Sequence, residues 1–103
     1  MINGYSIILP TLNEVGHIEK LILDISKICT LNNTKYEIIT VDDNSTDGTI
    51  DVVKKIKLKN PNVRIAVRIN KKKNLVESLK DGINMSKYNY IIWLDADYSH
   101  PPK

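Results

Sequence analysis

The chain alternates short apolar runs with longer segments in which apolar residues recur at a helical spacing. The runs fall at residues 5–9, 36–41, 63–67 and 90–94. Apolar runs of this length, bounded by turn residues, are typical of buried strands. The pattern therefore predicts four strands, and we expect the last of them to be buried.

Three segments between these strands carry apolar residues three or four positions apart, as on one face of a helix. We expect Asn13 to cap the first helix, Ser45 or Asp47 to open the second, and the third to run from Leu75 to about Ser86. The predicted inward positions are Val15, Ile18, Leu21, Ile22, Ile25, Ile28, then Ile50, Val53, Ile56, and finally Leu75, Val76, Leu79 and Ile83.

Strands that alternate with helices favour a parallel sheet with right-handed crossovers. We therefore predict one α/β unit that is Rossmann-like, with about four strands in the order 3-2-1-4 and helices on both faces. In that order the second and third strands lie on one side of the first strand and the fourth lies on the other, so the strand order reverses between the first and fourth strands. Ligands of open α/β sheets bind at the carboxyl edge beside such a reversal.

Each predicted strand is followed by a polar cluster, and a parallel sheet would gather all four clusters at one edge. The clusters are residues 10–14, 42–49, 68–74 and 95–100. Asp95 and Asp97 are one residue apart just past a strand, so both carboxylates would point the same way. Such a pair can hold a divalent cation through oxygen ligands. Glu14 would face the same crevice.

Two further acids, Asp42 and Asp43, stand at the tip of the second strand. Helix capping accounts for polar residues farther along this loop but does not require two acids at the strand tip. We interpret Asp43 as a carboxylate that binds a nucleobase or ribose, and Asp42 as a structural residue. Glu14 is equally compatible with ligand contact and with a first-turn acid favoured by the helix dipole.

Arg68 and Lys71–Lys73 form the main basic cluster of the chain. A solvated loop is the ordinary interpretation of such a cluster, but its position at the ligand edge favours a phosphate contact by Arg68 or Lys72. The net charge of +3 is mild, and the chain has one Trp and no Phe. Nucleic acid is therefore not indicated as a partner, because neither a strong basic patch nor an aromatic stacking platform is evident.

Cellular location is bounded by two features. Cys29 is the only cysteine, so no internal disulfide can form, which fits a reducing compartment. The longest apolar stretches fall far below the roughly 20 residues that span a bilayer. We expect a location in the cytoplasm or at the cytoplasmic face of a membrane. A short domain with an open sheet edge also favours pairing with another copy, and thus a homo-oligomer.

Taken together, PTLNE, VDDNSTDGT and LDADYSHPP resemble, in this order and spacing, family 2 of the inverting GT-A glycosyltransferases. Within that family the motifs resemble the dolichol-phosphate mannose synthases and related polyprenyl-phosphate sugar transferases. The resemblance covers nearly all of residues 1–103. It implies a truncated glycosyltransferase domain that forms the nucleotide-binding half of a GT-A fold.

The resemblance further implies the substrates, the metal and the roles of site residues. The donor would be a nucleoside diphosphate sugar such as GDP-mannose, the cofactor Mg²⁺ or Mn²⁺, and the acceptor a polyprenyl or dolichyl phosphate at a membrane. The donor-binding residues would be Pro10, Leu12 and Glu14 at the base, Val41 and Asp43 at base and ribose, Arg68 in the basic loop, and Asp95, Ala96 and Asp97 at ribose, pyrophosphate and metal. Asp97 would be the catalytic residue through the metal that it holds, and the metal ligands would be Asp95, Asp97 and Ser99.

Four positions depart from this pattern. Leu12 stands where the family often has a tyrosine, and Ser99 where it often has a glutamine. Asn74 and Val76 stand where synthases of this branch often have glycine, in the loop after the third strand. Because Val disfavours a left-handed backbone, we expect this loop to have a different shape.

Two other functional classes of protein stay open for this sequence. Receiver domains and nucleotidyltransferases also bind Mg²⁺ at parallel strand ends, but a receiver needs an acid where this chain has Arg68, and PTLNE is not a glycine-rich basic loop. A non-catalytic nucleotide-binding or assembly module is the second alternative, because a complete GT-A domain needs roughly twice this length. Among transferases, one with another sugar donor or acceptor also stays open. We expect the acceptor site to follow Lys103, and the isolated chain to bind nucleotide weakly with little transfer activity.

Overall fold

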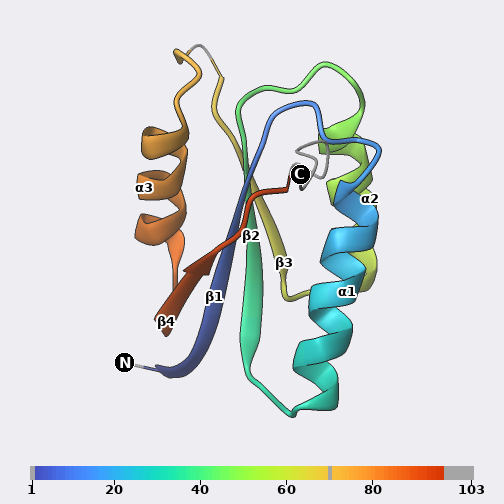
Figure 1. The fold of residues 1–103 in the computed structure, drawn as a ribbon, viewed down its shortest axis with the longest axis vertical. Coiled ribbons are helices and arrows are strands. Elements are labelled where there is room, and N and C mark those ends of the chain that lie inside the picture. The colour runs from blue at the N-terminus through green and yellow to red at the C-terminus, as the bar shows by residue number, and fades with distance from the viewer. Residues whose placement is uncertain (1, 70, 97–103) are drawn as a thin grey trace, which may run out of the picture.

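The computed structural model describes residues 2–69 and 71–96. Its four strands are β1 (Ile2–Thr11), β2 (Tyr36–Asp42), β3 (Val63–Val67) and β4 (Tyr88–Trp93), and its three helices are α1 (Ile18–Leu31), α2 (Thr49–Lys59) and α3 (Leu75–Met85). The strands form one parallel sheet in the order β3-β2-β1-β4. α3 lies on one face of the sheet, and α1 and α2 lie on the other (Figure 1). The predicted α/β class, strand order and two-sided helix layers are therefore confirmed.

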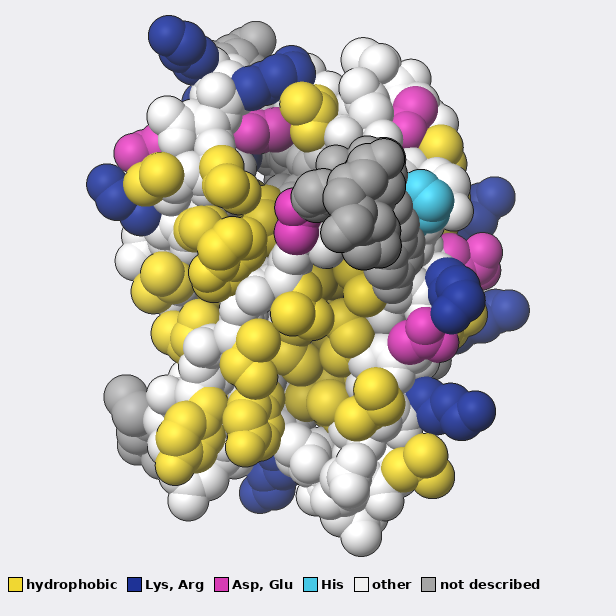
Figure 2. All heavy atoms as spheres, in the orientation of Figure 1, with side chains coloured by type: hydrophobic (Ala, Val, Ile, Leu, Met, Phe, Trp, Pro, Cys, Tyr) yellow, Lys and Arg dark blue, Asp and Glu magenta, His cyan; other side chains and the backbone are white. Residues whose placement is uncertain are grey.

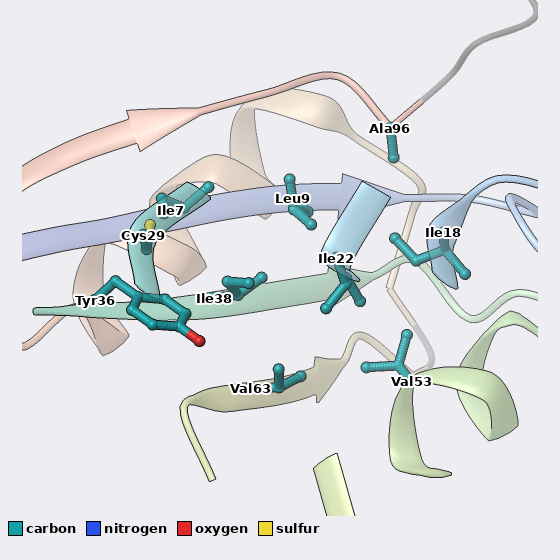
Figure 3. Packing of buried hydrophobic residues seen from close by; sticks show 10 residues of the cluster. All are labelled: Ile7, Leu9, Ile18, Ile22, Cys29, Tyr36, Ile38, Val53, Val63 and Ala96. Carbon is teal, nitrogen blue, oxygen red and sulfur yellow. The ribbon is translucent and has the colours of Figure 1, made fainter. Parts of the chain in front are cut away.

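Two apolar cores flank the sheet because successive residues of a strand point to opposite faces. Ile7, Leu9 and Ile38 lie in the core under α1 and α2, together with Val53 (Figure 3). Residues Ile8, Ile39 and Val41 form the core that faces α3. Cys29 of α1 is buried in the first core, as expected for an inert thiol.

The helix α3 packs closely on β1 through a glycine. A Cβ atom added at Gly82 would lie 2.6 Å from Cγ2 of Ile8. Ser78 and Gly82 are the buried residues of this helix, and Leu79 packs on the core beside them. The large residues Leu75, Val76 and Ile83, predicted to point inward, are instead about half exposed. Small side chains therefore set the distance between α3 and the sheet.

The first helix begins later than predicted, and its expected cap has another role. α1 starts at Ile18, and His17 occupies the N-cap position without a side-chain capping bond. Asn13 has a positive φ of 57°, and its side-chain oxygen accepts a hydrogen bond from the backbone N–H of Thr46. Val15 lies in the loop before the helix. The cap prediction at Asn13 is wrong because a partner distant in sequence binds this side chain.

The second helix also starts after the predicted residues. α2 begins at Thr49 behind Gly48, whose φ of 99° is left-handed and favours glycine. Asp47 nevertheless satisfies the helix start, because its carboxylate accepts a hydrogen bond from the backbone N–H of Thr49 at 3.0 Å. Ser45 does not open the helix and binds Asp42 instead.

The fourth strand is an exposed edge strand, so the prediction of a buried strand is wrong. β4 pairs with β1 on one side, and no other described strand pairs with its outer side. The side chains of residues 90–94 are 38–56% exposed, and Figure 2 shows hydrophobic side chains gathered over this part of the surface. The apolar pattern reveals a strand but does not reveal whether helices will cover it.

A buried carboxylate, that of Glu37, holds together the amino end of the sheet, opposite the loops that follow the strands. Glu37 accepts hydrogen bonds from Ser6 Oγ at 2.6 Å, from the N–H of Lys87 at 2.8 Å, and from Arg64 Nη1 at 2.8 Å. Burial raises the pKa of Glu37, but these bonds outweigh burial and hold the pKa below its ordinary range.

Within the described part of the chain, none of the helices combines the length and apolarity that crossing a bilayer requires.

The close contact between α3 and β1 can be tested with Gly82→Val. We expect this change to lower the free energy of unfolding by about 1–3 kcal/mol, because the added side chain overlaps Ile8. Urea unfolding followed by circular dichroism measures the change. Gly16→Val is the control, since nothing lies within 4 Å of a Cβ there. Equal losses in the two variants would contradict the close contact.

Candidate functional site

A pocket lies at the carboxyl edge of the sheet, where the strand order reverses between β1 and β4. Its cavity volume is about 340 Å³. The ends of β1, β2 and β4 and the start of α3 form its walls. Five predicted site residues line it, namely Pro10, Leu12, Glu14, Asp43 and Asp95. The structure therefore brings together three carboxylates from three separate polar clusters.

Asp43 is the most constrained of these carboxylates. Its Oδ1 accepts a hydrogen bond from Nη1 of Arg68 at 2.5 Å. Its Oδ2 accepts hydrogen bonds from the N–H of Asn74 at 3.1 Å and from Oγ of Ser78 at 3.2 Å. The Asp43 and Arg68 side chains are only 9% and 6% exposed. The end of β2 is thereby attached to the start of α3.

The side chain of Arg68 is bound by other side chains and does not line the pocket. Besides its bond to Asp43, it donates from Nε to Oδ2 of Asp81 at 3.1 Å. The carbonyls of Lys72 and Asn74 lie 3.4 Å from its Nη1. The described guanidinium contacts are thus structural, and the phosphate contact of Arg68 or Lys72 stays a prediction. Lys73 is the member of the basic cluster that lines the pocket.

The loop that carries Leu12 and Glu14 is held by the loop after β2 and by the first residue of α2. The backbone N–H groups of Asn13, Glu14 and Val15 donate to side-chain oxygens of Ser45, Thr49 and Asp47 at 2.7–3.1 Å. Backbone N–H groups in a loop need side-chain partners of this kind because no neighbouring strand or helix turn accepts their hydrogen bonds. These bonds give the polar loop residues a structural role and position one wall of the pocket.

Asp42, the last residue of β2, and Asp47, in the loop after it, support this connection. Asp42 is fully buried and accepts hydrogen bonds from Oγ1 of Thr11 and from the N–H and Oγ of Ser45, which agrees with its interpretation as structural. Burial raises the pKa of Asp47, but hydrogen bonds from Thr49 and from the N–H of Val15 outweigh burial, so this pKa lies below its ordinary value.

The remaining predicted residues fall outside the pocket lining or outside the described residues. Val41 is fully buried in the core that faces α3, and Ala96 is fully buried in the core under α1 and α2. Asp97 and Ser99 lie outside the residues that the structure describes. Their catalytic and metal-binding roles therefore stay predictions.

The departures at Asn74 and Val76 have a simple structural explanation. Asn74 is the N-cap of α3, with an extended φ of −161°, and its side chain accepts a hydrogen bond from the N–H of Glu77. Val76 lies within the helix. Neither position requires the left-handed backbone that favours glycine, so the loop accommodates both residues without strain.

Sequence reasoning did not assign several pocket residues. These are Thr11, Lys73, Asn74, Leu75, Ser78 and Trp93. Trp93 had one signal, since it stands near the carboxyl end of the predicted strand 90–94, next to the polar cluster that begins at Asp95. Ser78 had none, because a serine within a helical pattern gives no indication that it will bind a carboxylate on another element.

The donor chemistry of the pocket fits a hard divalent cation. Mg²⁺ and Mn²⁺ prefer oxygen ligands, and Asp95 and Glu14 supply carboxylates to one pocket. Within residues 2–69 and 71–96, no group of three or more His, Cys, Asp or Glu side chains is close enough to hold an ion by itself. Asp95 is the one predicted metal ligand that these ranges include.

The sequence matches known proteins over almost its whole length. The family model described as glycosyl transferase family 2 matches residues 6–103. The dolichol-phosphate mannosyltransferase of Saccharomyces cerevisiae is 35% identical over 100 residues, which cover 96% of this chain. The same alignment covers 37% of the yeast protein, so the chain spans little more than a third of that relative.

Solved structures with the same fold include two glycosyltransferases. The structure of Staphylococcus aureus TarS 1–349 aligns with a TM-score of 0.78 at 23% identity, over 91% of this chain and 27% of the TarS 1–349 chain. The mannosyltransferase PcManGT from Pyrobaculum calidifontis, in complex with GDP-Man and Mn²⁺, aligns with a TM-score of 0.74 at 21% identity, over 94% of this chain and 28% of PcManGT. At these identities the likeness establishes the GT-A type of fold alone.

The Asp43–Arg68 ion pair can be tested through stability. We expect Asp43→Ala to lower the free energy of unfolding by about 3–5 kcal/mol, because it leaves a buried guanidinium without one of its carboxylates. Urea unfolding measures this loss. Asp24→Ala removes an exposed pair with Lys20 and should cost no more than about 0.5 kcal/mol. A loss at Asp43 no larger than at Asp24 would show that the pair does not support the fold.

Proposed function

The chain belongs to glycosyl transferase family 2, and from this membership we propose that residues 1–103 are the nucleotide-sugar-binding part of an inverting sugar transferase. The observation that carries the proposal is the pocket at the strand reversal, where Glu14, Asp43 and Asp95 gather. In the proposed reaction, mannose moves from GDP-mannose to a polyprenyl or dolichyl phosphate. The name of the yeast relative and the GDP-Man bound to PcManGT support this choice of donor.

The proposed roles combine the lining of the pocket with the resemblance of the motifs to the family. Asp43 accepts hydrogen bonds from the base or ribose with the lone pairs that its protein partners leave available. Pro10 and Leu12 give the base an apolar contact, and Asp95 binds the ribose and the pyrophosphate side. Asp95, Asp97 and Ser99 would hold Mg²⁺ or Mn²⁺, and the ion would supply a Lewis acid that neutralises negative charge on the departing diphosphate.

The proposed acceptor needs little activation. A phosphate monoester has a second pKa of about 6 and is largely ionised at neutral pH. Its oxygen attacks the anomeric carbon from the face opposite the diphosphate, the bond from that carbon to the diphosphate oxygen breaks, and the configuration inverts. Because an acceptor of this kind lies in a membrane, the proposed location of the complete enzyme is the cytoplasm or the cytoplasmic face of a membrane.

A non-catalytic nucleotide-binding module is the second candidate. It is favoured by the fact that the chain corresponds to little more than a third of the yeast relative. Both candidates share the donor pocket, and they differ in whether residues 1–103 support transfer. Release of GDP from GDP-mannose in the presence of dolichyl phosphate separates them, and we expect little release from this chain by itself.

Calorimetric titration with GDP, UDP and GDP-mannose, with and without Mn²⁺, tests the donor pocket. We expect weak binding that Mn²⁺ strengthens, with GDP preferred over UDP. Asp97→Ala should remove the effect of Mn²⁺, and Asp24→Ala, far from the pocket lining, should bind as the unaltered chain does. Absence of binding to all three nucleotides would contradict the donor pocket, and a preference for UDP would contradict the mannosyl donor.

The open edge of β4 is the proposed site of self-association. The N–H of Leu94 donates to the carbonyl of Ile8 at 3.0 Å. Because backbone groups of a strand alternate in direction, those of Ile91 and Trp93 point away from β1. An antiparallel copy centred on Ile91 would pair Tyr90 with Ile92, and no charged residue lies in Tyr88–Trp93 to oppose this pairing.

Sedimentation velocity over a range of protein concentrations tests this pairing. We expect a reversible dimer in the unaltered chain and a monomer for Ile91→Lys, because a charge at an edge strand blocks pairing. Leu58→Lys is the matched control, since Leu58 is 87% exposed on α2 and away from β4, and it should dimerise normally. A monomer at every concentration of the unaltered chain would overturn the proposal.

A further inference from the structure

Trp93 stands out among the described residues that line the pocket, because it is the single aromatic side chain there. It is also the only tryptophan of the chain. Its position on β4 beside Ile8 of β1 places it near the strand reversal, and it is 50% exposed. A large apolar ring that is half exposed at a pocket wall offers a surface that a ligand can cover.

The pocket combines this ring with other apolar side chains and with acceptors. Leu12 and Leu75 are 38% and 52% exposed, and they line the same pocket as Trp93. Asp43, nearly buried, and Asp95 contribute carboxylate oxygens to it. A ligand that matches such walls has a flat apolar face and N–H groups at its edge, which are the properties of a nucleobase.

The size of the cavity agrees with this chemistry. Small-molecule sites have volumes of roughly 300–1,000 Å³, and the pocket, at about 340 Å³, lies at the lower end of that range. Replacing an aromatic side chain that stacks on a base with alanine costs about 1–3 kcal/mol of binding free energy per base. Neither leucine at the pocket can supply such stacking, because an aliphatic side chain has no π-face.

We infer that Trp93 is the stacking surface for the nucleobase of the donor. The inference rests on the proposed function and adds a residue that determines base affinity. A purine covers more of an indole ring than a pyrimidine does, so this surface favours GDP over UDP. Trp93 thereby supplies the aromatic contact that Leu12 lacks.

The single tryptophan allows a direct experiment. Titration of the unaltered chain with GDP is followed in parallel by tryptophan fluorescence and by calorimetry. We expect saturable quenching with the same Kd as the heat signal. Trp93→Leu should bind GDP about 5-fold to 150-fold more weakly, as loss of stacking requires, while Trp93→Phe should retain most of the affinity.

A ligand without a base provides the matched control. Pyrophosphate with Mn²⁺ should bind the unaltered chain and Trp93→Leu equally, because stacking does not contribute to it. If GDP binds by calorimetry without quenching, and Trp93→Leu binds it equally well, the stacking role is wrong while the nucleotide pocket stands. If no nucleotide binds the unaltered chain, the proposed function fails and this inference fails with it.

Discussion

The buried ion pair between Asp43 and Arg68 is the interaction on which the geometry of the pocket depends. A charge removed from water must be paired, since an isolated buried charge costs several kcal/mol. This requirement forces the end of β2, the end of β3 and the start of α3 to meet at one place, where Asn74 and Ser78 complete the bonds to Asp43. The carboxylate that faces the pocket is therefore held in one orientation before any ligand arrives, which reduces the entropy lost on binding.

The same principle operates at both ends of the sheet with different partners. At the ligand edge, side-chain oxygens of the loop after β2 satisfy the backbone N–H groups of Asn13 and Glu14. At the opposite end, Glu37 satisfies Ser6, Lys87 and Arg64. The central strands lie between these two polar networks and are almost wholly buried. The sheet is thus fixed in register by apolar packing and closed at each end by carboxylates.

The sequence was sufficient to predict the fold because the apolar periods are local properties. The strand at Val63–Val67 and the order of the elements followed from them directly. The errors at Asn13, at the face of α3 and at β4 share another cause, since each depends on residues far away along the chain. Asn13 binds Thr46, Gly82 meets Ile8, and β4 is exposed because of its place in the strand order. The motifs likewise indicated three carboxylates of the pocket, but the partners of Asp43 and the contribution of Ser78 emerged only from the folded arrangement.

The strand order also determines when the pocket can form during protein synthesis. β4 is the last described element along the chain, yet it pairs with β1, the first. Domains generally fold as units, so the sheet can form only after β4 has been made, although β1, β2 and β3 are made first. Trp93 and Asp95 complete the pocket lining at this last stage. A ligand of the pocket would therefore stabilise the complete fold by mass action, but it has no site on the chain before β4 is made.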